Sequence, residues 1–425
     1  MAQYHITGGR RLAGALEIGG GKNAALPILA ACVLAEGESV LHSCPRISDT
    51  RTALAILRAV GCPAWFDGGT HSVTVNAAPA CNAAVPEALV REMRAAIIFL
   101  GGLLGRFGTV EIGYPGGCEL GARPIDLHLK ALRQMGAEIT EAHGVIRAKA
   151  PGKRLRGARL HLDFPSVGAT ENIMLAAVLA EGETVLTNAA REPEIADLQG
   201  FLNAMGARVR GAGTGTVTVE GVERLHGAEY TVMPDRIVAG TMLAAAAMTG
   251  GEVTLANVVP AHLSAVLSKL SEAGCILRED ARRRTVRLAA PERLRAIDCL
   301  RTLPHPGFPT DMQSQLMACL TLARGTSVCV ETVFESRNKH VAELRRMGAD
   351  IVAQDGQTAV VKGVERLHGA PVTVRDLRGG AALTIAGLAA EGTTLVSDIS
   401  HIERGYEDFP GDLRALGADI TRIEG

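Results

Sequence analysis

The chain has 425 residues, of which 47% are hydrophobic, 3% aromatic and 21% charged, and its formal net charge is −1. This length and apolar content predict a large core divided among two or three domains. The near-neutral charge argues against a general nucleic-acid binder, so any anion site must be a local cluster of basic residues. The scarcity of aromatic side chains argues against a surface on which nucleic-acid bases stack.

Nine cysteines are scattered along the chain without a CxxC pair, which fits neither a disulfide framework nor a zinc site and indicates a reducing cytoplasm. The N-terminus lacks the basic and apolar regions of a signal peptide. The longest apolar runs, 95–104 and 239–248, fall short of the roughly 18 residues of a membrane-spanning helix. We therefore expect a soluble, cytoplasmic protein with no membrane contact, no metal and no cofactor.

The N-terminal segment predicts a strand, Tyr4 to Thr7 with Ala15 to Ile18, and after it one phrase recurs six times. An apolar helix-like run ends at a glycine and is followed by a β-branched strand, a second helix, another glycine and two further strands. The octapeptide GVERLHGA occurs at 221–228 and again at 363–370. The sequence is therefore interpreted as six copies of a unit of about 70 residues.

The two helices of each unit differ in character. The first, such as 24–35 or 239–248, is apolar around its circumference and is predicted to be buried on all sides. The second, such as 126–135 or 341–347, carries charged residues on one face and is predicted to lie nearer the surface. Six buried helices are too many for one core, so we expect two domains of three units each, with helices inside and sheets outside.

The leftover first strand is expected to complete the last unit, which requires the chain to cross between domains twice, near residues 21 and 233. The predicted domains are therefore 22–233, which carries a cysteine loop, and 1–21 with 234–425. That loop, 113–127, contains four glycines and two prolines in fifteen residues and places Cys118 five residues before Arg123. A thiol beside a guanidinium in such a loop is unusual for a structural cysteine.

Polar residues stand where each buried helix is predicted to begin. Converging helix N-termini provide unpaired amides and partial positive charge for an anion. Ordinary N-capping is the simpler explanation for Asp235 and Asp376. A cation at a helix N-terminus is unfavourable without an anion, so Lys22, Arg94 and Arg378 predict an anion site.

The phrases GGKNAALPILAA, PGGCELGARPIDLH, NAAREPEI, RTLPHPGFPTDMQSQ, ETVFESR, DLRGGAAL and HIERGYE closely resemble the bacterial UDP-N-acetylglucosamine enolpyruvyl transferases. The resemblance spans the whole chain and implies the first committed step of peptidoglycan synthesis. It implies transfer of the enolpyruvyl group of phosphoenolpyruvate to the 3′-hydroxyl of UDP-N-acetylglucosamine, with release of phosphate by addition and elimination. It also implies an α/β fold of two inside-out, barrel-like domains, each of three repeated units.

The resemblance also implies roles for individual residues. Cys118 matches the proton donor, which can form a covalent adduct with the substrate and react with fosfomycin-type inhibitors. Asp311 matches the acceptor of the sugar's hydroxyl proton. Lys22, Arg123 and Arg404 match positions that contact the phosphate of phosphoenolpyruvate, and Arg378 is the expected partner of its carboxylate. The positions that match contacts to the nucleotide sugar are Asn23, Arg94, Arg123, Pro124, Ile125, Asp126, Leu127, Ser166, Val167 and Val333.

The chain departs from the family pattern at Phe164, where Lys is frequent, and at Ser336, where Asn is usual. Both lie at the nucleotide-sugar edge of the pocket and neither touches the reacting atoms. Two alternatives remain open. One is a sister enolpyruvyl transferase with another acceptor, such as shikimate 3-phosphate, and the other is a non-catalytic paralogue that binds a nucleotide sugar.

Overall fold

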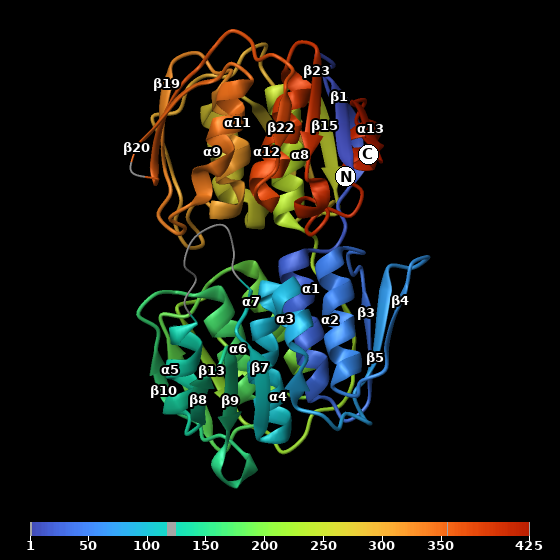
Figure 1. Cartoon of the computed structure of the whole chain (residues 1–425), viewed down its shortest axis with the longest axis vertical. Helices are drawn as coiled ribbons and strands as arrows, with labels where there is room; N and C mark the ends of the chain where they lie inside the picture. The colour runs from blue at the N-terminus through green and yellow to red at the C-terminus, as the bar shows by residue number, and fades with distance from the viewer. Residues whose placement is uncertain (1, 117–124, 355, 425) are drawn as a thin grey trace. The chain divides into compact units, whose positions relative to one another are not determined.

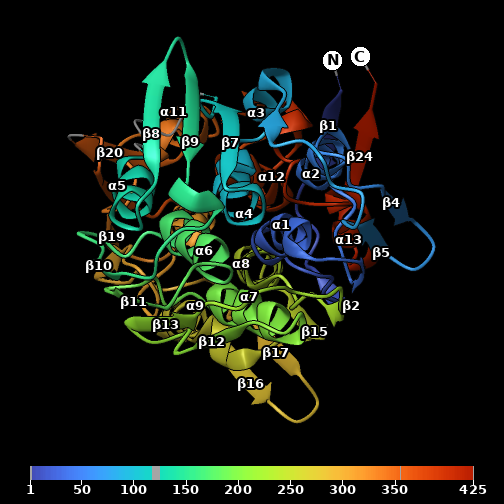
Figure 2. The ribbon, with the colours of Figure 1, turned by 90° about the horizontal axis from the view of Figure 1, so that it is seen from below.

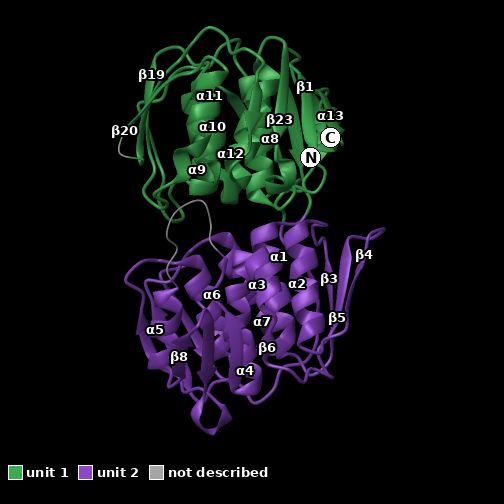
Figure 3. Ribbon diagram, viewed as in Figure 1, with its two compact units in different colours: residues 1–19, 119–121, 234–425 green, residues 20–118, 122–233 purple. Residues whose placement is uncertain are grey.

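The computed structural model describes residues 2–116, 125–354 and 356–424. These residues form two compact units, one of residues 2–19 and 234–424 and the other of residues 20–116 and 125–233 (Figure 3). The chain passes from one unit to the other between Gly19 and Gly20 and again between Met233 and Pro234. Among these residues no helix is both long and apolar enough to cross a lipid bilayer.

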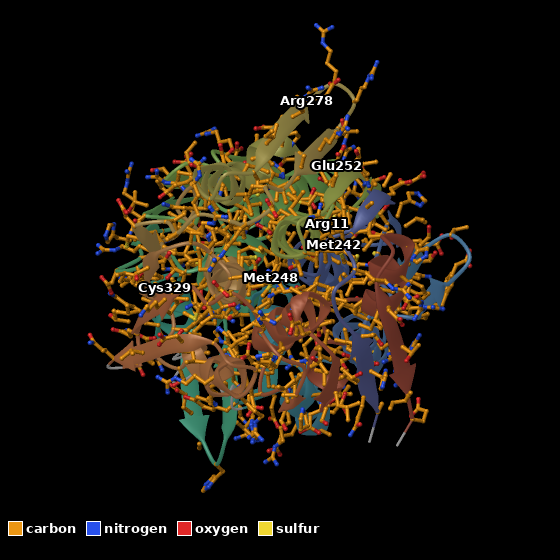
Figure 4. All side chains as sticks on the ribbon, turned by 90° about the horizontal axis from the view of Figure 1, so that it is seen from above. Arg11, Met242, Met248, Glu252, Arg278 and Cys329 are labelled. Atoms are coloured by element: carbon orange, nitrogen blue, oxygen red, sulfur yellow. The ribbon has the colours of Figure 1, made fainter. Side chains whose placement is uncertain are left out.

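Each unit has a centre of apolar helices, as predicted. In the described part of the chain these inner helices are α1 (Lys22–Ala31), α4 (Phe99–Phe107), α6 (Val167–Ala177), α8 (Arg236–Met248), α10 (Gln313–Leu320) and α12 (Leu377–Ala389). Helices α8, α10 and α12 pack against one another, and α4 packs between α1 and α6 (Figures 1 and 2). Met242 and Met248 of α8 lie in the interior, whereas Arg278 is exposed at the periphery (Figure 4).

The outer helices bury one face and expose charged residues on the other, which also agrees with the sequence pattern. They are α2 (Ser48–Ala59), α3 (Glu87–Glu92), α5 (Asp126–Gln134), α7 (Pro193–Ala204), α9 (Ser264–Glu272), α11 (Val341–Arg346) and α13 (Phe409–Ala415). After α5 and α11 the chain reverses at Gly136 and Gly348, whose φ angles of 92° and 95° favour glycine. In the fourth repeat the sequence pattern predicts the helix stop at Gly251, but the left-handed residue is the preceding Gly250.

Three four-stranded sheets surround the inner helices of each unit. In the unit of residues 20–233 they are, in spatial order, β14 (Glu229–Thr231), β3 (Glu38–His42), β5 (Ser72–Asn76) and β4 (Ala64–Asp67); β6 (Ala84–Val85), β7 (Thr109–Gly113), β9 (Val145–Lys149) and β8 (Glu138–Ala142); and β10 (Arg159–His161), β11 (Glu183–Thr187), β13 (Thr216–Glu220) and β12 (Arg208–Arg210). The first two strands of each sheet are parallel and the remaining pairs are antiparallel.

The other unit repeats this order. Its sheets are β2 (Ala13–Glu17), β15 (Glu252–Ala256), β17 (Thr285–Ala289) and β16 (Ile276–Asp280); β18 (Cys299–Arg301), β19 (Thr326–Val330), β21 (Thr358–Lys362) and β20 (Asp350–Gln354); and β22 (Pro371–Thr373), β23 (Thr393–Ser397), β1 (Gln3–Thr7) and β24 (Asp419–Ile423). The predicted α/β class with inner helices and outer sheets is confirmed.

The N-terminal segment corrects one expectation. Strand β1 completes the sheet of the last repeat, as predicted, by pairing with both β23 and β24. Strand β2, which was grouped with it, pairs instead with β15 in the sheet of the fourth repeat. The two strands therefore enter different sheets: β1 lies between β23 and β24, whereas β2 occupies the edge of its sheet beside β15.

Close packing of α4 on α6 depends on Gly101. A Cβ at this position would lie 2.2 Å from the carbonyl oxygen of Asn172, which is a backbone atom that cannot rotate away. We expect Gly101→Ala to lower the free energy of unfolding by at least about 2 kcal/mol, because the two helices must separate. Urea denaturation measures this, and Gly68→Ala, in an exposed turn with ordinary van der Waals distances, is expected to remain within about 0.5 kcal/mol of wild type.

Candidate functional site

Asp311 is held between two buried arginines in the unit of residues 234–424. It lies in the single 3₁₀ turn η5 (Thr310–Met312), which precedes α10. Arg337 Nη2 donates to Asp311 Oδ1 at 3.0 Å, and Arg378 Nη2 donates to Oδ2 at 3.0 Å. The carboxylate is about one quarter exposed, whereas the two arginine side chains are 1% and 3% exposed. Both oxygens of Asp311 are therefore oriented by fixed cations.

Arg337 is fixed by several further contacts. Its Nε donates to Thr310 Oγ1 at 3.2 Å, and its Nη1 lies 3.8 Å from Asp376 Oδ1. The guanidinium carbon lies 4.9 Å from the centroid of the Phe334 ring. A buried cation is stable only when it is paired and hydrogen bonded, and these contacts meet that requirement.

Arg378 stands at the second position of α12 and retains unused hydrogen-bonding capacity. Burial lowers its pKa, but the interactions with Asp311, Tyr406 and Asp235 together outweigh burial and raise the pKa above its ordinary value. Its guanidinium carbon lies 5.9 Å from the centroid of the Tyr406 ring. Nη1 is buried and has no hydrogen-bond partner among the described residues. A donor of this kind is a suitable contact for an anionic ligand.

The capping interpretation of the aspartates is correct. Asp376 Oδ1 accepts hydrogen bonds from the backbone N–H groups of Arg378 and Gly379, both at 3.0 Å. Asp235 Oδ1 caps α8 in the same way, with distances of 2.7 Å to Ile237 N and 2.9 Å to Val238 N. These carboxylates stabilise helix N-termini, and Asp376 also contributes negative charge near Arg337.

The second group of predicted residues lies in the unit of residues 20–233. Lys22 is the first residue of α1, and its Nζ lies 3.6 Å from Oδ2 of the buried Asp49. Asn23 follows it and is half buried. The N-cap residue of α1, Gly21, supplies no side-chain hydrogen bond. The helix start therefore presents an ammonium group and backbone donors together.

Ser166 lies at the start of a buried helix as expected, whereas the helix start at Arg94 differs in part from the expected one. Arg94 begins the 3₁₀ helix η2 (Arg94–Ile98), which precedes α4, and its Nη1 lies 3.4 Å from the carbonyl oxygen of Gly116. The sequence pattern places residues 91–94 together in the first turn of this buried helix, but α3 ends at Glu92 and extended backbone at Met93 separates it from η2. Ser166 caps α6 by accepting from Ala169 N at 3.3 Å, and Val167 is the first residue of that helix.

The remaining predicted residues lie at element boundaries. Ile125 is buried before α5, Asp126 is exposed and Leu127 is half buried. Val333 follows β19, and Arg404 follows the short helix η7 (Ile399–His401). Cys118, Arg123 and Pro124 lie outside the described residues. At the divergent positions, Phe164 is 44% exposed and Ser336 precedes η6 (Arg337–His340) without capping it by a side-chain bond.

The structure brings Asp311 and Arg378 into direct contact, and Lys22 into contact with Asp49. The sequence alone did not predict a role for Arg337, Asp49 or Glu331. Arg337 ends the phrase ETVFESR, so its place in a long specific motif was an available signal. Nothing local to Asp49 distinguishes it from an ordinary first-turn carboxylate of α2.

His128 of α5 belongs to a buried hydrogen-bond network. His128 Nδ1 is 2.8 Å from Asn172 Nδ2, while Asn172 Oδ1 accepts from Gly101 N at 2.6 Å. Because that backbone donor fixes the orientation of the amide, His128 must accept through an unprotonated Nδ1. Burial, together with the charge of Arg94, lowers the pKa of His128 to about 4, although Asp126 opposes this shift.

This network predicts an acid-sensitive fold. The folded pKa of His128 is below the unfolded value, so the unfolded state binds more protons between pH 6.5 and about 4. We expect stability to fall through this window as pH decreases, by on the order of 3 kcal/mol from this residue. Urea midpoints measured between pH 7 and 4 check this: His128→Gln is expected to flatten the dependence, and the exposed His143→Asn is expected to leave it unchanged.

Comparison with known proteins gives matches over essentially the whole chain. Residues 6–413 match the family described as EPSP synthase (3-phosphoshikimate 1-carboxyvinyltransferase). The chain is 52% identical over 423 residues to UDP-N-acetylglucosamine 1-carboxyvinyltransferase 2 of Caldanaerobacter subterraneus subsp. tengcongensis, with 100% of both chains covered. It is 51% identical over 424 residues to UDP-N-acetylglucosamine 1-carboxyvinyltransferase of Dichelobacter nodosus, again with 100% of both covered.

Solved structures agree with these matches. The enolpyruvyl transferase NikO from Streptomyces tendae superimposes with a TM-score of 0.88 at 25% identity, covering 100% of this chain and 99% of that one. EPSP synthase from Acinetobacter baumannii superimposes with a TM-score of 0.75 at 21% identity, covering 100% of both chains. The second likeness shows the fold alone.

Proposed function

The chain belongs to the EPSP synthase family of carboxyvinyl transferases, and we propose that it transfers the enolpyruvyl group of phosphoenolpyruvate to the 3′-hydroxyl of UDP-N-acetylglucosamine. Inorganic phosphate is the second product. The observation that carries the acceptor is the identity of about 50% over full length to relatives named for this acceptor. In a bacterial cell this reaction supplies a precursor of peptidoglycan.

The geometry at Asp311 supports an acid–base role. A carboxylate whose two oxygens accept hydrogen bonds from fixed guanidinium groups is held in one orientation, and it remains partly open to a ligand. In the addition step the acceptor oxygen bonds to C2 of the enol, and its proton passes to Asp311. Carbon C3 receives a proton from Cys118, which gives a tetrahedral phosphate-bearing adduct. In the elimination step C3 returns a proton to the Cys118 thiolate, the bond between C2 and the phosphate oxygen breaks, and the C2–C3 double bond is restored. The departing phosphate takes up the proton held by Asp311, so both side chains return to their starting state.

Cations bind the charges of phosphoenolpyruvate in this proposal. The buried Nη1 of Arg378 provides a donor for the carboxylate, and Arg337 adds positive charge beside it. Lys22, Arg123 and Arg404 are assigned to the phosphate. Asn23, Arg94, Ser166, Val167, Val333 and residues 123–127 are assigned to the nucleotide sugar. Each assignment follows the sequence resemblance, and for the described residues among them it is supported by their placement at helix starts and between elements.

A phosphate-release assay tests the function. Wild-type protein with phosphoenolpyruvate and UDP-N-acetylglucosamine is expected to release one phosphate per sugar consumed. Substitution of shikimate 3-phosphate for the nucleotide sugar is expected to give no release above background. Turnover with the shikimate alone identifies the sister activity, and binding of the nucleotide sugar without any turnover identifies a non-catalytic paralogue.

The role of Cys118 is tested by labelling with fosfomycin. We expect one equivalent to add to Cys118, located by peptide mass spectrometry, and Cys118→Ala to abolish the addition. Of the eight described cysteines only Cys81 is exposed, and burial raises the pKa of Cys62 to about 11 and that of Cys44 to about 12. Cys81→Ser is therefore the matched control and is expected to label fully; label on any other thiol contradicts the assignment.

A further inference from the structure

Five of the six repeats close their sheets in the same way, which allows equivalent positions to be compared; in the second repeat the residue after β6 is Pro86, which has no N–H to donate. In five sheets the residue after the short first strand donates its N–H to the carbonyl that ends the neighbouring strand. These donors are Ile18, Leu162, Val232, Thr302 and Val374, and the distances lie between 3.0 and 3.2 Å. The residues that follow the neighbouring strands are, in the same sheets, Asn257, Asn188, Ser43, Glu331 and Asp398.

Four of these five pairs satisfy the same structural requirement. The first member is a buried aliphatic residue, and the second has a left-handed backbone with φ between 52° and 60°. In two pairs the asparagine side chain also donates to the carbonyl of the first member, at 2.8 Å from Asn188 to Leu162 and 2.7 Å from Asn257 to Ile18. The fold is therefore built successfully from an aliphatic residue and a small polar one.

The fifth repeat departs at both positions. Thr302 replaces the aliphatic residue and is 0% exposed, and Glu331 replaces the small residue and is 1% exposed. Glu331 Oε1 accepts from Thr302 Oγ1 at 2.9 Å, from Val333 N at 2.8 Å and from Phe334 N at 3.1 Å. A buried carboxylate is costly unless it is fully hydrogen bonded. The four other pairs close their sheets without one, so we infer that Thr302 and Glu331 serve a purpose other than closing the sheet.

The other carboxylate oxygen of Glu331, Oε2, is connected to Asp311 by a chain of hydrogen bonds. Oε2 accepts from Thr310 Oγ1 at 2.9 Å, and Thr310 Oγ1 accepts in turn from Arg337 Nε at 3.2 Å. Arg337 then donates to Asp311. One carboxylate thus ties the backbone of Val333, assigned to the nucleotide sugar, to the guanidinium that orients the assigned proton acceptor.

We propose that Glu331, supported by Thr302, is a positioning residue that fixes the Val333–Phe334 backbone and the Arg337–Asp311 pair in a single geometry. This inference rests on the proposed function, since it assigns a purpose to the alignment of Asp311 with the bound sugar. Glu331 touches no substrate in this proposal. It acts through the donors that surround it, and small displacements of such a pair are sufficient to lower turnover.

Two substitutions test the inference. Thr302→Val installs the side chain that two other repeats carry at this position, so the sheet is expected to fold with a urea midpoint near that of wild type. Glu331→Gln keeps the size but removes one acceptor oxygen. We expect each to lower kcat and to raise KM for UDP-N-acetylglucosamine, with kcat/KM falling about tenfold for Thr302→Val and more for Glu331→Gln. Asn257→Gly, at the position in the fourth repeat that corresponds to Glu331, is the control and is expected to retain wild-type kinetics.

A double substitution tests whether Glu331 acts on turnover through Asp311. In an Asp311→Asn background Glu331→Gln is expected to lower kcat by less than twofold, because its main target has already been lost. Wild-type kcat and KM in both Thr302→Val and Glu331→Gln overturn the inference, as does a lower urea midpoint with unchanged kinetics. Failure of wild-type protein to release phosphate overturns the proposed function instead, so the two failures are distinguishable.

Discussion

Asp311→Asn is expected to lower the rate of phosphate release by roughly 10²–10⁴-fold while the protein still binds UDP-N-acetylglucosamine. Asparagine has nearly the same size, but its amide accepts a proton poorly, and its NH₂ group faces a guanidinium where Oδ1 or Oδ2 accepted a hydrogen bond. The substitution therefore removes the base and leaves a donor opposite a donor. Turnover, nucleotide-sugar affinity by calorimetry and the urea midpoint are measured together.

The matched control for this prediction is Asp350→Asn. Asp350 begins β20 in the same repeat and is exposed, so the same change of charge there is expected to leave kcat within about twofold of wild type. The acid–base assignment is contradicted when Asp311→Asn retains more than a tenth of wild-type phosphate release. Loss of nucleotide-sugar binding together with turnover points to a folding or binding defect and also contradicts it.

Arg378→Lys is the second substitution with a large expected effect. Lysine keeps the charge but lacks the planar fork that donates to Asp311 through Nη2 while Nη1 remains available for a ligand. We expect kcat/KM for phosphoenolpyruvate to fall by roughly 10–100-fold, mainly through KM, because a charge-assisted hydrogen bond contributes about 1.5–3 kcal/mol. Affinity for UDP-N-acetylglucosamine alone is expected to stay near the wild-type value.

Steady-state kinetics with phosphoenolpyruvate as the varied substrate check this expectation. Arg346→Lys, on the exposed side of α11, makes the same chemical change where the guanidinium contacts only Glu343 among the described partners, at 3.4 Å. It is expected to behave like wild type. An unchanged KM for phosphoenolpyruvate in Arg378→Lys, with the fold intact by circular dichroism, refutes the assignment of Arg378 to the substrate carboxylate.

Some residues of the site were predictable from the sequence and others were not. Asp311 and Arg378 were selected because they match long motifs, and the structure then places them in contact across 67 positions of sequence. Arg337 belongs to an equally long motif but was given no role, since nothing in ETVFESR indicates that its last residue reaches back 26 positions to Asp311. Cys118 and Arg123 rest on the motif alone.

The sequence by itself determined the repeating unit, the inner and outer helices and the caps at Asp235 and Asp376. These features depend on interactions between residues a few positions apart, namely backbone hydrogen bonds, side-chain caps and the period of apolar residues. Local chemistry is written directly in local sequence, so it could be deduced without knowing the partners of any element.

Only the tertiary structure decided which distant elements meet. It places β1 and β2 in two different sheets, and it shows that β14 closes the sheet of the first repeat. It also reveals that the fifth repeat alone, among the five compared, replaces an aliphatic residue and a left-handed one by Thr302 and Glu331. Pairing between remote strands and buried charges depends on the packed arrangement of the whole unit, and no periodicity along the chain records it.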